Sequence, residues 1–152
     1  MTRATSILPS QLENIASYRM IPASHAVLTE EQKGLLQRLD RFEAPYLEEK
    51  LLSDGEFQNK SNYQEAFTEF KKYAALSQIV KGHLGMTSVK VDTLWHQFVL
   101  FTKQYADFCR DYLGSFLHHS PHVSTTPEDR KKEGIVNFAK SYQQVFGEIP
   151  LI

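Results

Sequence analysis

Apolar residues recur three or four positions apart along most of this chain, which is the spacing of one face of an α-helix. Such a face is normally buried against other helices. The predicted buried stripes are Leu35, Leu39, Phe42 and Tyr46; Tyr63, Phe67, Phe70 and Ala74; and Ile135, Phe138, Tyr142 and Val145. No segment alternates convincingly between apolar and polar residues, so the pattern predicts no β-strand.

Residues that start and stop helices lie between these stripes. Capping boxes, in which two side chains satisfy free backbone N–H groups, are predicted at Ser10–Glu13, Thr29–Gln32 and Ser61–Gln64. Thr126 and Pro127 predict one more start, with proline at the first helical position. Pro45 is expected to kink or divide its helix. Gly82, Gly114 and Gly147 predict helix ends.

These signals predict an all-α fold, a single-domain bundle of five or six helices around a long central helix. The central helix is expected from residue 88 or 89 to Leu113. Residues 1–28 are predicted to form an N-terminal arm with a short helix, and residues 29–152 the helical core. A chain of 152 residues has the length of one domain and can bury about 70% of its unfolded surface.

The predicted central helix has two chemically different faces. Its core side is expected to carry Leu94, Phe98, Phe101, Tyr105, Phe108, Cys109 and Tyr112. On the other side, Asp92 and His96 lie one turn apart, so the carboxylate can hydrogen-bond the imidazole and fix its tautomer. His96 and Cys109 are about 140° apart around a straight helix. They can therefore share a metal only if the helix breaks.

The composition excludes several classes of protein. A net charge of −1 provides no field that would attract nucleic acid or an anionic membrane. The single cysteine rules out an internal disulfide, and no apolar run has the length of a signal peptide or a membrane span. We therefore expect a soluble protein of the cytoplasm.

The segment around the only tryptophan resembles the conserved module of the glycine-rich-domain-containing protein family, known from plants and from small bacterial proteins. The resemblance covers roughly residues 66–121. It is carried by Asp92, Trp95, His96, Tyr105, Cys109, Gly114 and Pro121. The plant forms have a second histidine two places after the first, where this chain has Phe98. The resemblance implies an α-helical module, without an agreed activity, in which these residues form a structural motif.

The same segment contains the candidate metal ligands. They are Asp92, His96, His118, His119 and His122, and zinc is the metal that such nitrogen and oxygen donors favour. A chain reversal at Gly114 would bring one of the later histidines back to the helix. The alternative is a hydrogen-bonded packing motif with a polar exit loop. Cys109 is a candidate nucleophile in a pair with His119, although its aromatic surroundings favour burial in the core.

These residues favour a helical interaction module that binds a protein partner without catalysis, a cofactor, nucleic acid or a membrane. The alternative is a metal-binding protein, including a metal-dependent hydrolase, that uses Asp92, His96 and the histidines at 118–122. No catalytic residue can be named from the sequence.

Overall fold

The structure is a computed structural model that describes residues 18–120 and 123–152. Over these residues the chain forms six α-helices and one π-helical turn, without any β-strand. The elements are α2 (Glu30–Arg41), α3 (Pro45–Ser53), α4 (Lys60–Ile79), α5 (Val89–Leu100), α6 (Thr102–Phe108), the π-helix η1 (Cys109–Leu113) and α7 (Glu128–Phe146). The predicted all-α fold is confirmed. The helix predicted near Ser10 lies outside the described residues.

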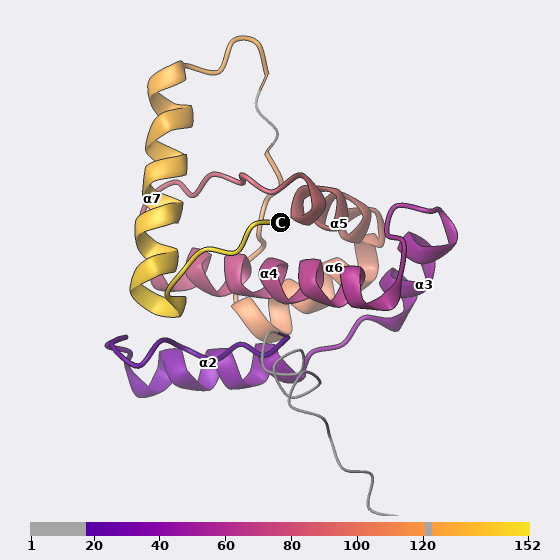
Figure 1. Ribbon diagram of the computed structural model, residues 1–152, viewed down its shortest axis with the longest axis horizontal. Coiled ribbons are helices and arrows are strands. Elements are labelled where there is room, and N and C mark those ends of the chain that lie inside the picture. Colours follow the sequence, from indigo (N-terminus) through magenta and orange to yellow (C-terminus); the bar gives the residue numbers. More distant parts are fainter. Residues whose placement is uncertain (1–17, 121–122) are drawn as a thin grey trace, which may run out of the picture.

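Helix α4 occupies the centre of the bundle (Figure 1), where it contacts α2, α3, α5, η1 and α7. Its twenty residues include buried positions on almost every side, among them Tyr63, Phe67, Phe70, Tyr73 and Ala74. Helix α7 stands across one end of α4, and its N-terminal half extends beyond the rest of the bundle. None of the helices in the described part of the chain has the length and apolar character needed to cross a membrane.

The long central helix predicted up to Leu113 is not confirmed, because it divides into α5, α6 and η1. Phe101 leaves the helical region with φ −81° and ψ 66°, and α6 begins at the next residue. The break allows Phe101 to pack on Tyr46 of α3, with ring centroids 5.2 Å apart. Tyr105 and Phe108 still reach the core beyond the break. Aromatic packing thus outweighs the continuous helical pattern of the sequence.

The predicted helix starts are confirmed to different degrees. At Thr29 the capping box forms, since its Oγ1 accepts from the Gln32 N–H at 3.1 Å and its own N–H donates to Gln32 Oε1. The start predicted at Ser61 is wrong by two residues, because Asn59 is the N-cap and accepts from the Asn62 N–H. Asparagine satisfies that N–H as well as serine does. Pro45 divides its helix as expected and begins α3.

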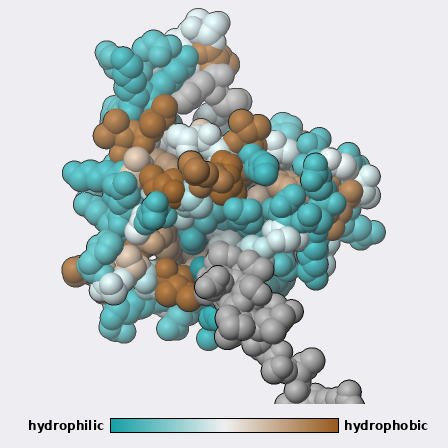
Figure 2. Space-filling view, viewed as in Figure 1, coloured by the Kyte–Doolittle hydropathy of each residue, from teal (hydrophilic) through white to brown (hydrophobic). Residues whose placement is uncertain are grey.

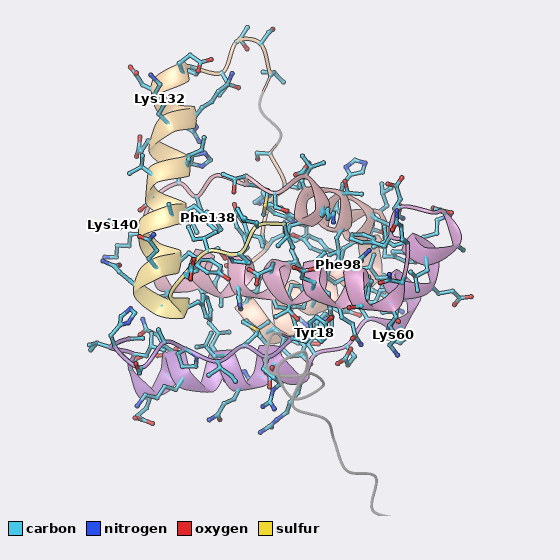
Figure 3. The ribbon with its side chains drawn as sticks, in the orientation of Figure 1. Tyr18, Lys60, Phe98, Lys132, Phe138 and Lys140 are labelled. Carbon is cyan, nitrogen blue, oxygen red and sulfur yellow. The ribbon has the colours of Figure 1, made fainter. Side chains whose placement is uncertain are left out.

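Helix α7 faces the bundle with three of its four predicted core residues. Phe138, Tyr142 and Val145 are buried, whereas Ile135 is 47% exposed. Ile135 belongs to the N-terminal half of α7, the half that extends beyond the rest of the bundle in Figure 1. Figure 3 shows Phe138 on the inner side of α7 and Lys140 on its outer side.

Hydrogen bonds near the C-terminal end and the middle of α7 help to hold it in place. Near its C-terminal end, the Tyr142 hydroxyl donates to Glu69 Oε2 at 2.7 Å and accepts from Lys72 Nζ at 3.2 Å. Near its middle, the Gly85 N–H donates to the Gly134 carbonyl at 2.9 Å. A Cβ atom at Gly134 would lie only 3.0 Å from the Gly85 nitrogen, so glycine is required for this close approach.

We predict that Tyr142→Phe lowers the free energy of unfolding by about 1–2 kcal/mol, because it removes a hydroxyl that satisfies two partly buried charged groups. Urea denaturation measures this loss. Tyr112→Phe is the matched control, since the Tyr112 hydroxyl makes no hydrogen bond with a described residue. An equal loss in both variants would show that the Glu69–Lys72–Tyr142 network does not stabilise the fold.

Candidate functional site

A cleft of about 540 Å³ lies beside the N-terminal end of α5. Its walls come from the end of α4, the loop between α4 and α5, the loop after η1, and α7. The lining residues are Tyr73, Ser77, residues 82–89, Asp92, Trp95, residues 117–120 and Arg130. This volume lies within the range of small-molecule and peptide pockets. We refer to it below as the α5–α7 cleft.

The loop after η1 is fixed to the core by a chain of hydrogen bonds. Trp95 Nε1 donates to the Tyr105 hydroxyl at 2.9 Å, and that hydroxyl donates to the Leu117 carbonyl. The Leu117 N–H points to Cys109 Sγ at 3.5 Å. Gly114, with φ 75°, makes the turn that returns the chain. Four residues of the predicted structural motif therefore act together to position this loop.

The returning loop places His119 against α5. His119 Nε2 lies 2.8 Å from Asp92 Oδ1, and its ring packs edge-on against Trp95 with centroids 4.6 Å apart. The His119 side chain is 12% exposed and that of Asp92 is 52% exposed. The sequence predicted the reversal at Gly114 correctly. The partner of Asp92, however, is His119 rather than the predicted His96.

The structure brings together only part of the predicted metal-ligand set. His96 is exposed, with its ring centroid 5.9 Å from that of His119. His118 is also exposed and packs against Phe116 at 4.8 Å. His122 and Pro121 lie outside the described residues. Within residues 18–120 and 123–152, no three His, Cys, Asp or Glu side chains are placed to hold a metal ion.

Burial controls the protonation of the groups beneath the cleft. It raises the pKa of Tyr73 to about 12, with a further contribution from the charge of Asp92, so the hydroxyl stays protonated and donates to the Leu84 carbonyl. Burial also raises the pKa of Tyr105 and of the Cys109 thiol. A raised thiol pKa disfavours the nucleophilic thiolate. Cys109 is 1% exposed, so the burial in the core that its surroundings favoured is confirmed. Its Sγ accepts from the Leu117 N–H rather than pairing with His119.

The sequence did not predict the part of the cleft that is formed by the loop between α4 and α5 and by α7. Tyr73, the loop of residues 82–88 and Arg130 all line the cleft, and none of them is a candidate site residue in the sequence. Gly134 allows this loop to approach α7, and Asn137 fixes it by donating to the His83 carbonyl at 2.9 Å. A glycine within a helix that is otherwise amphipathic was the one signal of this close contact.

Tyr105→Phe is expected to lower the free energy of unfolding by about 2–4 kcal/mol, because a buried Trp95 N–H and the Leu117 carbonyl lose their partner. Urea denaturation followed by the fluorescence of Trp95, the only tryptophan, measures both the stability and the environment of the cleft. Tyr46→Phe is the control, since the Tyr46 hydroxyl has no hydrogen bond to the described residues. If Tyr105→Phe were as stable as this control, the loop would be held by packing alone.

No curated protein and no solved structure matches this chain. The model of the UCP032817-like family matches residues 32–143, a span that includes most helices of the bundle and every described residue of the α5–α7 cleft. That family is uncharacterised and brings no activity with it, and the resemblance to glycine-rich-domain-containing proteins stays a prediction. With about three-quarters of its residues matched, the chain belongs to the UCP032817-like family.

Proposed function

We propose that this protein is an interaction module and that a segment of a protein partner binds in the α5–α7 cleft. The observation that carries the proposal is the cleft itself, which combines about 540 Å³ of open volume with a wall fixed to the core. A pre-formed site loses little conformational entropy on binding, which favours affinity.

The composition of the cleft supports a partner that is part polar and part apolar. Trp95 and Tyr73 provide aromatic surface beneath it, while Asp92 and His119 provide a polar pair. At its rim, Val89 is 79% exposed. Binding sites of this kind combine apolar lining with a few polar groups that orient the ligand.

We predict that a photo-crosslinking amino acid in place of Val89 forms adducts with a defined protein in an extract of the source organism. Leu100 is the matched control, because it lies on the same helix, is 61% exposed and does not line the cleft. An excess of unlabelled protein should suppress the adduct at position 89. No adduct, or the same adduct at both positions, would contradict an interaction site in this cleft.

Metal binding is the second candidate, favoured by the contact between Asp92 and His119. The contact also limits it, because Asp92 and His119 Nε2 could both bind the metal only if the Nε2 proton that bonds Asp92 were displaced. The remaining ligands would come from His96 after a side-chain rotation, or from a bound molecule. With an open coordination position, such a metal would activate water for hydrolysis.

Elemental analysis of the protein purified without a histidine tag tests this candidate. Stoichiometric zinc that is lost in His119→Gln and kept in His25→Gln would establish a metal site. His25 is the control because it lies outside the cleft, where Nε2 contacts the Gln143 carbonyl. The interaction proposal predicts no stoichiometric metal in any of the three proteins.

A further inference from the structure

The two fixed charges that line the α5–α7 cleft, Asp92 and Arg130, lie on different walls. Resting on the proposed function, we infer that the bound segment carries a carboxylate for Arg130 and a basic side chain for Asp92, with an apolar residue between them. The proposal depends on the unused bonding capacity of these two residues and on the apolar residues that line the same cleft.

Arg130 is available to an anionic group. It lies in the first turn of α7, is exposed, and makes no hydrogen bond or ion pair with residues 18–120 or 123–152. The nearby carboxylate of Glu128 forms an ion pair with Lys131 at 3.2 Å and not with Arg130. A guanidinium group binds a carboxylate through two parallel hydrogen bonds. An arginine on a cleft wall without an internal partner therefore favours an acidic group in the ligand.

Asp92 is available to a cationic group. Only its Oδ1 is bonded, to His119, and the side chain remains 52% exposed. Oδ2 has no hydrogen-bond partner within the described part of the chain. A carboxylate accepts hydrogen bonds at both oxygens and carries a negative charge. A lysine or arginine side chain that reaches Oδ2 neutralises this charge, whereas an anion bound here would be repelled.

The lining of the cleft is part polar and part apolar, as is the face of the molecule in Figure 2, where apolar patches lie among hydrophilic ones. Trp95, Tyr73, Met86 and Val89 supply the apolar part of the lining. An exposed valine in a cleft gains free energy when an apolar group covers it. A segment with opposite charges on either side of an apolar side chain therefore complements the two charges and the apolar part of the lining.

An array of short synthetic peptides tests this inference. The peptides place a lysine and a glutamate at every spacing around a central leucine or phenylalanine, and companion peptides replace either charged residue by glutamine. The wild-type protein is expected to retain peptides that carry both charges. Replacing either charge in the peptide should weaken binding about tenfold, the usual effect of losing one charged hydrogen bond.

Two variants assign the charges to residues. Arg130→Gln should abolish the preference for glutamate, and Asp92→Asn the preference for lysine, while Asn keeps a group that can bond His119. Lys132→Gln is the matched control, because this lysine lies about 200° around α7 from Arg130 and does not line the cleft. It should bind the peptides like the wild type.

Three results would overturn the inference. The protein could bind peptides with and without the charges equally well, or the charge preferences could be the same in both variants as in the wild type. The third is that the protein retains no peptide of the array. The proposed function would stand in each case if adducts still form at position 89. Absence of those adducts contradicts the proposed function itself, so the two failures are distinguishable.

Discussion

The hydroxyl group of Tyr105 connects the hydrophobic core to the α5–α7 cleft. It accepts a hydrogen bond from the indole of Trp95 and donates one to the backbone of Leu117. A single phenol can do both because its oxygen is a donor and an acceptor at once. Around it, the ring of Tyr105 packs against Phe98 at 5.0 Å. The position of the loop after η1, and therefore of His119, depends on this one buried polar group.

A buried hydrogen-bond chain of this kind fixes a single geometry, since any displacement leaves a donor or acceptor unsatisfied in a medium of low dielectric constant. Here the hydrogen bonds join α5, α6 and the loop after η1, on both sides of the break at Phe101. The π-helical turn at Cys109–Leu113 and the left-handed Gly114 then direct the backbone toward α5. The polar pair of the cleft is thus held by the core, although it lies at the surface.

The sequence predicted the helices well and the site in part. Helical spacing and capping residues located α2, α3, α4 and α7, because these signals are local. Of the residues predicted to form a structural motif in this segment, Trp95, Tyr105 and Cys109 contact one another or the loop after η1. The break at Phe101 escaped prediction because its cause is a contact with Tyr46, which is distant in the sequence. The sequence also did not predict that His119, rather than His96, is the partner of Asp92. The reason is the same, since tertiary contacts determine the path of the loop that carries His119.

The close contact between Gly85 and Gly134 has a consequence for the size of the cleft. These two residues let the wall formed by the loop of residues 82–88 touch α7, and Asn137 closes the contact one turn further along. A Cβ atom at position 134 would lie 2.8 Å from the ring of His83 and 3.0 Å from the backbone nitrogen of Gly85, so the ring and the loop would both have to shift. The spacing between the loop of residues 82–88 and α7 therefore depends on a side chain that is absent. A larger residue at this position would act on the wall of the cleft without replacing any residue that lines it.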